Sequence, residues 1–325
     1  MKKIICCLLT VVMALGMLTG CGSSDAESEK EYKVAIVQQL DHSSLDEIRE
    51  AVEAELTSLA EEKGIKITYT EFNGHNDSTT LNQIGSQVVD DGYDAIIPIA
   101  TLAAQCMVTA AEGKDIPIIY AAISDPESAG LTGIDYVTGT SDALNTEYLL
   151  DMMLAVQPDV KTVGLLYSNS EVNSEMPIEQ AKAYLDKKGI AYIEKTGNTA
   201  EEILAAAGAL VGRADAVFTP TDNVVMASES AIAETLNAAG IPHYTGADSF
   251  VTSGAFTTCG VDYADLGVYT ASMAVDILLG GEIPEYHVME GGIITVNTDT
   301  AAQLNIDYSV FESMSTSVVE TKTAE

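Results

Sequence analysis

Small hydroxyl-bearing and acidic residues stand in two stretches of the chain that share one order of features. In the first stretch, Thr101 follows an apolar run at 94–100, and Ser124 with Asp125 follow a second run at 116–120. In the second, 221–223 (Thr-Asp-Asn) follows a run at 215–219, and 248–249 (Asp-Ser) follows a run at 241–244. Hydroxyls and main-chain N–H groups at a helix start can hold an anionic group, and carboxylates can hold an ammonium. These residue types fit a zwitterion such as an amino acid, and a sugar bound through hydroxyls is the competing ligand.

Further polar residues occupy comparable positions at the ends of predicted strands, where ligands bind in parallel α/β sheets. The full set is Ser43, Ser44, Thr101, Ser124, Asp125, the segment 168–174, Thr221, Asp222, Asn223, Asp248 and Ser249. We expect the two halves of this set to face each other across one cleft. For any single Ser or Thr, the simpler role is to cap the helix that follows it.

The arginine content limits how a carboxylate can be bound. The chain has two arginines: Arg49 falls inside a predicted helix, and Arg213 precedes a strand at the end away from the cleft. We therefore expect helix N-termini and hydroxyls, rather than a guanidinium, to hold a ligand carboxylate.

The residue patterns typical of catalysis and metal binding do not occur. The histidines, His42, His75, His243 and His287, are not spaced as a metal-binding pair. The chain contains no GxSxG motif, no phosphate-binding glycine loop and no CxxC motif. The sequence predicts a binding protein rather than an enzyme, with no metal and no cofactor.

Strands alternate with helices along the chain, which predicts a parallel sheet with helices on both faces. The pattern starts with the apolar run 33–37 and restarts at 162–167. The segment 187–190 (Lys-Lys-Gly-Ile) echoes 62–65 (Glu-Lys-Gly-Ile) 125 residues earlier. A repeat of this length, in a chain of 325 residues, predicts two lobes of one α/β topology.

The N-terminal segment predicts export. Lys2 and Lys3 precede a short apolar run at 4–17, and small residues before Cys21 fit signal-peptide cleavage. The run 18–21 (Leu-Thr-Gly-Cys) resembles the bacterial lipobox, which implies a signal peptide at 1–20, lipid attachment to Cys21 and a tether at 21–31. An ordinary signal peptide with an incidental cysteine is the alternative.

The formal net charge of −34 disfavours nucleic acid and anionic lipid headgroups as partners.

Several segments in combination resemble the substrate-binding lipoproteins of ABC transporters, in the subfamily often labelled tryptophan/tyrosine-type. The resemblance spans about residues 32–306. It rests on 34–38 (VAIVQ), 99–105 (IATLAAQ), 124–126 (SDP), 162–167 (TVGLLY), 170–174 (SEVNS), 220–223 (PTDN), 248–249 with 254–255, and 262–263 with 266–267.

This resemblance implies a type I periplasmic-binding fold, in which two Rossmann-like lobes with parallel sheets are joined by a three-segment hinge. Lobe 1 would comprise 32–139 and 261–280, lobe 2 would comprise 140–260 and 281–310, and 311–325 would be a disordered tail. Carried over by motif, the ligand-binding residues are Thr101, Asp125, Glu171, Asn173, Ser174, Thr221, Asp222, Asn223, Asp248 and Ser249. Ser43 and Ser44 are added to this set because they follow the first predicted strand. The chain departs from the family pattern at Ser168, where relatives often have Asn, and in the loop 39–44.

The implied function is capture of a small ligand, an amino acid and in this subfamily an aromatic one, by closure of the hinge. Delivery to the permease subunits of an ABC importer would follow. The protein would act at the extracytoplasmic face of the cell membrane, held there by the lipid on Cys21. The alternatives are a ligand-sensing lipoprotein, a sugar- or other metabolite-binding protein on the same fold, and a hydrolase on a two-lobed scaffold. A transcription regulator of this fold would carry a DNA-binding segment, and we expect none before Lys33.

Overall fold

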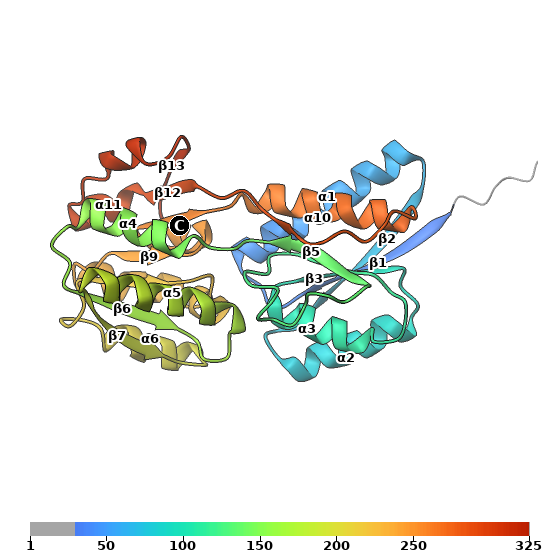
Figure 1. The fold of residues 1–325 in the computed structure, drawn as a ribbon, viewed down its shortest axis with the longest axis horizontal. Coiled ribbons are helices and arrows are strands. Elements are labelled where there is room, and N and C mark those ends of the chain that lie inside the picture. The colour runs from blue at the N-terminus through green and yellow to red at the C-terminus, as the bar shows by residue number, and fades with distance from the viewer. Residues whose placement is uncertain (1–29, 325) are drawn as a thin grey trace, which may run out of the picture.

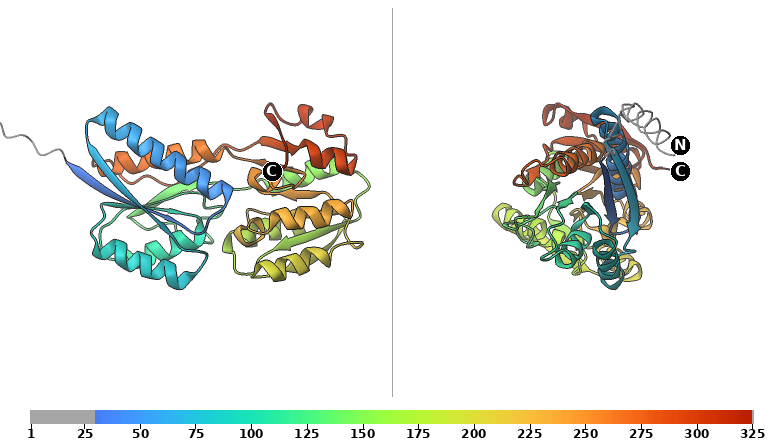
Figure 2. Two further views of the ribbon diagram at one scale, coloured as in Figure 1. Left: turned by 180° about the vertical axis from the view of Figure 1, so that it is seen from behind. Right: turned by 90° about the vertical axis from the view of Figure 1, so that its right-hand side faces the viewer.

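A computed structural model describes residues 30–324 as two α/β lobes that lie side by side (Figure 1). Each lobe is built on one sheet, and helices cover both faces of that sheet (Figure 2). All strand pairs but one are parallel within the described residues. The predicted α/β class with two parallel-sheet lobes is confirmed.

The first lobe contains a sheet with the strand order β11-β5-β4-β3-β1-β2. Its elements are β1 (Glu31–Gln38), α1 (Ser43–Lys63), β2 (Lys66–Asn73), α2 (Ser78–Asp90), β3 (Ala95–Ile99), α3 (Thr101–Ala110), β4 (Ile118–Tyr120), β5 (Val137–Ser141), α10 (Tyr263–Leu278) and β11 (His287–Val288). The central strands β1, β3 and β4 are almost entirely buried, as expected for parallel strands covered on both faces.

The second lobe contains a sheet with the strand order β13-β12-β10-β9-β8-β6-β7, in which β10 and β12 form the antiparallel pair. Its elements are α4 (Thr146–Val156), β6 (Thr162–Tyr167), α5 (Val172–Lys188), β7 (Ala191–Thr196), α6 (Ala200–Gly208), β8 (Ala216–Thr219), α7 (Asn223–Met226), α8 (Glu229–Ala238), β9 (His243–Thr245), α9 (Asp248–Thr252), β10 (Thr257–Gly260), β12 (Ile293–Asn297), α11 (Thr298–Leu304), a 3-10 helix at Ser309–Ser313 and β13 (Val318–Thr321).

The chain passes between the two sheets three times, after β5, after β10 and after β11. The second passage sends α10 back to the first lobe, where it lies alongside α1 (Figures 1 and 2). A Cβ atom on Gly267 would come within 2.7 Å of the main-chain oxygen of Ile48. Glycine at this position therefore permits the close approach of the two helices that fixes α10 to the first lobe.

Two segment assignments made from the sequence differ from the structure. The segment 281–310 was expected in the second lobe, but β11 adds to the first sheet by pairing with β5. The segment 311–325 was expected to be a disordered tail, but Phe311 is fully buried and β13 pairs with β12. Pairing with β13 covers the edge of β12. Phe311, Met314 and Val318 pack on the core of the second lobe, but the polar residues between them mask this apolar pattern in the sequence.

The repeated glycines of the two halves end equivalent helices. Gly64 follows α1 with φ 63°, and Gly189 follows α5 with φ 71°, both in the left-handed region that favours glycine. Each donates its N–H to carbonyls of the last helical turn. Both helices are thereby ended at the point from which the next strand, β2 or β7, runs back toward the cleft.

Two further findings concern membrane-spanning helices and the cysteines. Across residues 30–324, no helix combines the length and apolar character needed to cross a lipid bilayer. Cys106 and Cys259 are buried and unbridged thiols. The predicted signal peptide and the acylated Cys21 lie outside the described residues.

Candidate ligand-binding site between the lobes

The carboxyl ends of the strands of both sheets meet at one narrow cavity between the lobes. The first lobe contributes residues that follow β1, β3 and β4, and the second contributes residues that follow β6, β8 and β9. Two residues of the crossover segments, Asp142 and Tyr263, complete the lining. The lining residues are His42, Ser44, Leu45, Ala100, Thr101, Ala122, Ser124, Asp142, Asn173, Thr221, Asp222, Asn223, Met226, Ala247, Ser249, Phe250 and Tyr263.

The predicted site residues divide into three groups. Those that line the cavity are Ser44, Thr101, Asn173, Thr221, Asp222, Asn223 and Ser249. Glu171 and Ser174 stand directly behind it, where Glu171 bonds Asn223 and Ser174 bonds Asp222. Those that do not reach the cavity are Ser43, Asp125 and Asp248.

The three remote residues have other roles in the structure. Ser43 is exposed at the start of α1. Asp125 is buried, and its Oδ1 accepts a hydrogen bond from the main-chain N–H of Ser128 at 3.0 Å, which shapes the turn after β4. Asp248 lines a separate hollow that it shares with Glu47 and Asp262. Burial, opposed by hydrogen bonds to main-chain N–H groups but reinforced by Asp262, raises the pKa of Asp248.

Four hydrogen bonds join the lobes directly across the cavity. Ser44 Oγ donates to Ser249 Oγ at 2.6 Å, and the hydroxyls of Ser124 and Thr221 are 2.9 Å apart. Gln39 Nε2 donates to Glu171 Oε1 at 3.1 Å, and His42 Nε2 lies 3.0 Å from Asn223 Oδ1. The volume left between these side chains is about 30 Å³. The lobes are in direct contact here, and the remaining volume is smaller than an amino acid.

Asp142 is a buried carboxylate at the first crossover. Its Oδ1 accepts a hydrogen bond from Ser124 Oγ at 2.9 Å, and its Oδ2 accepts one from Tyr263 Oη at 3.0 Å. No salt bridge reaches it from any residue between 30 and 324. Burial raises its pKa, and the two hydroxyl donors counteract this effect in part. A carboxylate so placed, on the wall of a cavity, is matched by a cationic group of a ligand.

Both carboxylate oxygens of Asp222 accept hydrogen bonds from residues of the second lobe. Its Oδ2 accepts from the main-chain N–H of Ser168 and from Ser174 Oγ, both at 2.7 Å. Its Oδ1 accepts from the main-chain N–H of Val225 at 3.0 Å and so caps α7. These contacts tie together the ends of β6 and β8, and they assign Asp222 to building the cavity wall.

Glu171 is buried between the lobes and precedes α5. Its two oxygens accept hydrogen bonds from Gln39 in the first lobe and from Asn223 in the second, at 3.1 and 2.6 Å. Burial first, and repulsion by Asp222 second, raise its pKa to about 7. Separation of the lobes would break the Gln39 contact and admit water to the carboxylate.

Two alanines at the cavity have backbone conformations that L-amino acids rarely adopt. Ala100 has φ 74° and ψ 163°, and Ala122 has φ 57°. Ala100 directly precedes α3, and the main-chain N–H of Leu102 in the first turn of that helix donates to Gln39 Oε1 at 3.0 Å. Strained residues of this kind gather at ligand sites, where the surrounding structure holds them in place. Here Ala100 brings the start of α3 to the cavity, and Ala122 lines the cavity after β4.

An apolar wall completes the site. Leu45 comes from the first lobe, and Met226 and Phe250 come from the second. Tyr120 and Tyr244, which also lie near strand ends, are fully buried in the two cores. The cavity therefore pairs a polar region of hydroxyls and one unpaired carboxylate with an apolar region suited to a hydrophobic side chain.

Sequence reasoning did not select several cavity residues. Asp142 directly follows β5 and Tyr263 begins α10, and neither lies in the strand-end turns that guided the selection. His42, and Gln39 behind the cavity, belong to the loop after β1, which the sequence marked as a departure from the family pattern. Ser124 was recognised as a strand-end residue, and its place beside Asp142 required the structure.

Two α/β lobes, three crossovers and a cavity at facing strand ends define a two-lobed solute-binding protein of the type I periplasmic-binding fold. The chain belongs to the family described as ABC transporter substrate binding protein, whose family model matches residues 33–322. The resemblance seen in the sequence is confirmed at this level.

Three relatives bear on the ligand. A protein named "Tyrosine-binding protein" from Clostridioides difficile (strain R20291) is 33% identical over 323 residues, covering 94% of this chain and 93% of its own length. A domain from Streptococcus pneumonia, crystallised in complex with L-Trp, is 29% identical with a TM-score of 0.82, covering 89% of this chain and all of its own. A ligand-free, open structure of a substrate-binding protein with adhesive properties from Clostridium difficile is 31% identical with a TM-score of 0.68, covering 90% and 100%.

Proposed function

We propose that this protein is the lipid-anchored, extracytoplasmic solute-binding component of an ABC importer, and that it captures an aromatic amino acid between its lobes without turnover. The observation that carries the proposal is the buried carboxylate of Asp142, which lines the cavity with hydroxyl partners and has no salt bridge from residues 30–324. A ligand ammonium supplies the missing charge.

The ligand carboxylate is held by groups of the same cavity. Thr101 begins α3, a helix of ten residues whose N-terminus opens at the cavity, and Ser44 and Ser249 provide hydroxyls. Neither Arg49 nor Arg213 lines this cavity. Helix N–H groups and hydroxyls can bind an anionic group without a guanidinium.

The ligand side chain occupies the apolar wall formed by Leu45, Met226 and Phe250. Aromatic rings bury a large apolar area in such surroundings. One relative is named a tyrosine-binding protein and another was crystallised with L-Trp, and both match this chain over about nine-tenths of its length. These relatives support an aromatic amino acid over a sugar, which would leave the apolar wall without a partner.

Capture works by movement of the lobes about the three crossovers. The narrow cavity and the four direct contacts between the lobes correspond to a closed arrangement. The higher TM-score with the L-Trp complex than with the open, ligand-free relative supports this assignment. A ligand that contacts both lobes favours the closed state, because its binding energy is fully available only there.

Calorimetric titration of the chain from Gly22 onward tests the proposal. Tyrosine, tryptophan, phenylalanine, the branched amino acids and a set of sugars are the ligands. We expect an aromatic amino acid to bind with a dissociation constant below about 1 μM, which corresponds to roughly −8 kcal/mol. Binding of sugars alone would overturn the proposal, and binding of a different amino acid would retain the mechanism with another side chain. A matched titration with Asp142→Asn identifies the ammonium partner.

A further inference from the structure

His42 lines the cavity and carries a buried ring nitrogen without a hydrogen-bond partner among residues 30–324. The residue precedes α1, lines the cavity and lies 3.0 Å from Asn223 Oδ1 through its Nε2. Its Nδ1 is buried and has no hydrogen-bond partner among residues 30–324. Burial lowers the pKa of His42, so the ring is neutral and carries one N–H donor and one bare acceptor nitrogen.

A chain of hydrogen bonds decides which nitrogen of His42 carries the proton. The main-chain N–H of Leu102 donates to Gln39 Oε1, which fixes the Gln39 amide so that its Nε2 faces Glu171 and donates to Oε1. This orientation does not depend on a choice of protonation, because a main-chain N–H can only donate. The carboxylate of Glu171 accepts at both oxygens.

The next two links follow from the ionised carboxylate. Asn223 Nδ2 donates to Glu171 Oε2 at 2.6 Å, so Asn223 presents its Oδ1 to His42. An amide oxygen can only accept, and His42 Nε2 must therefore carry the hydrogen. His42 Nδ1 is left as the bare acceptor, and it is the nitrogen without a partner.

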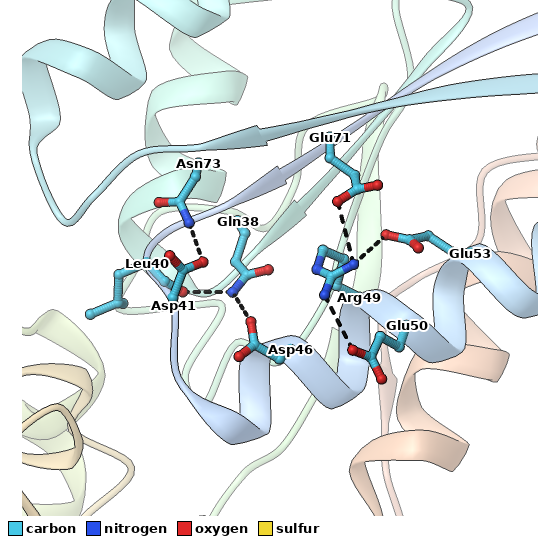
Figure 3. A network of polar contacts seen from close by, with 9 residues as sticks. All are labelled: Gln38, Leu40, Asp41, Asp46, Arg49, Glu50, Glu53, Glu71 and Asn73. Atoms are coloured by element: carbon cyan, nitrogen blue, oxygen red, sulfur yellow. Dashed lines mark hydrogen bonds and ion pairs between the residues drawn. The ribbon is translucent and has the colours of Figure 1, made fainter.

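The loop that holds His42 is fixed from behind. Gln38 Nε2 donates to the main-chain oxygen of Leu40 at 2.7 Å and to Asp46 Oδ1 at 2.8 Å, and Asn73 bonds Asp41 (Figure 3). These contacts join the end of β1 to the first turn of α1 and to β2. The imidazole therefore meets a ligand from a prearranged position.

We propose that His42 Nδ1 accepts a hydrogen bond from the ring donor of an aromatic amino acid, the phenol O–H of tyrosine or the indole N–H of tryptophan. His42 is then a specificity-determining residue that disfavours phenylalanine. The inference rests on the proposed function, since it assigns the recognition of the side chain in the same cavity. Leu45, which lines the same cavity, carries no group that could compete with His42 Nδ1 for the ligand donor.

The test compares tyrosine with phenylalanine, which differ by the phenolic hydroxyl alone. Titrations are run at pH 8, above the pKa of about 7 of Glu171, so that the carboxylate that sets the chain of hydrogen bonds is ionised. We expect tyrosine to bind about 10- to 100-fold more tightly than phenylalanine, because phenylalanine would leave the buried Nδ1 acceptor unpaired. In His42→Leu this ratio should fall to within about threefold of unity while phenylalanine still binds. The same change at an exposed histidine away from the cavity, His75→Leu, should leave the ratio unchanged.

A second measurement does not depend on a variant that folds. With ¹⁵N-labelled histidine, addition of tyrosine should shift the Nδ1 resonance of His42, and addition of phenylalanine should not. Equal affinity of the wild type for the two ligands, or an equal loss of both in His42→Leu, would overturn the role of His42. If no aromatic amino acid binds at all, the proposed function itself fails, and this outcome differs from binding without discrimination.

Discussion

Ser44 in the first lobe donates a hydrogen bond of 2.6 Å to the hydroxyl of Ser249 in the second. Both residues are buried, and both line the cavity. Each stands in the first turn of a helix, α1 and α9, so the contact joins two helix starts from opposite lobes. Under the proposed closure of the lobes, separation would break this contact, so the pair would report on closure.

A disulfide between these positions should lock the closed state. In the double variant Ser44→Cys with Ser249→Cys, the two sulfur atoms replace hydroxyls in direct contact and lie within bonding reach. We expect the oxidised variant to lose rapid exchange of ligand, and reductant to restore it, as measured by stopped-flow binding of tyrosine. The pair Ser43→Cys with Ser249→Cys is the control, because Ser43 is exposed and does not line the cavity. Equal binding rates before and after quantitative oxidation would contradict the hinge mechanism.

Asp142 and Asp248 should respond differently to the same substitution. Asp142→Asn removes the carboxylate that faces the cavity, and we expect it to weaken amino-acid binding by about 2–5 kcal/mol, as for loss of one partner of a buried charge pair. Asp248→Asn alters a hollow outside the cavity, and affinity should stay within about 0.5 kcal/mol of the wild type. Calorimetric titration of both variants measures these affinities. A larger loss of affinity in Asp248→Asn than in Asp142→Asn would mean that the ligand ammonium does not bind at Asp142.

The sequence predicted the two lobes and the strand ends better than the side-chain directions. Thr221, Asp222 and Asn223 were found because they directly follow a buried strand. Successive residues in a helical turn point about 100° apart. This step turns Ser249 toward the cavity and Asp248 away, and it likewise separates Ser44 from Ser43.

Residues at the crossovers were not predicted from the sequence, for a different reason. Asp142 and Tyr263 come from segments 121 residues apart, and their hydrogen bond exists only once α10 has returned to the first lobe. The sequence carries no local signal for such a pair. The same holds for β13, whose pairing with β12 depends on the edge that β12 leaves open.

The buried Glu171 should make stability depend on pH. Its pKa is raised from 4.5 to about 7 in the folded protein, first by burial and then by Asp222. Because the folded state binds this proton more tightly, the stabilisation is complete below pH 4.5 and is lost as pH rises toward 7. The slope is at most about 1.4 kcal/mol per pH unit for one proton. We expect denaturant titrations to give a lower free energy of unfolding at pH 8 than at pH 5.

Glu171→Gln should flatten this dependence, since a neutral amide resembles the protonated acid at every pH. Glu175→Gln, in the same helix but exposed, is the matched control and should keep the wild-type profile. A profile for Glu171→Gln that is as steep as that of the wild type would assign the titration to other buried acids, such as Asp142 or Asp222.

Attachment to the membrane should depend on Cys21, which precedes the described residues. We expect Cys21→Ala to move the protein from the membrane fraction to the soluble fraction of cells, because the lipid would have no acceptor thiol. Cys106→Ala is the control, since this thiol is buried within the first lobe. Unchanged membrane association of Cys21→Ala would exclude lipid attachment at this residue.

Replacing Ala100 with glycine should stabilise the protein, although an alanine-to-glycine substitution usually destabilises a folded protein. At φ 74° and ψ 163° its backbone lies in a region that is essentially reserved for glycine, and the conformation costs on the order of 1–3 kcal/mol. Ala100→Gly removes this strain but gives the unfolded chain more freedom, which offsets roughly 0.4–1 kcal/mol. We expect a net stabilisation of about 1 kcal/mol in denaturant titrations. Ala103→Gly, inside α3, should instead destabilise the protein by about 1 kcal/mol or more. If Ala100→Gly lowers stability as Ala103→Gly does, the backbone of Ala100 is not strained.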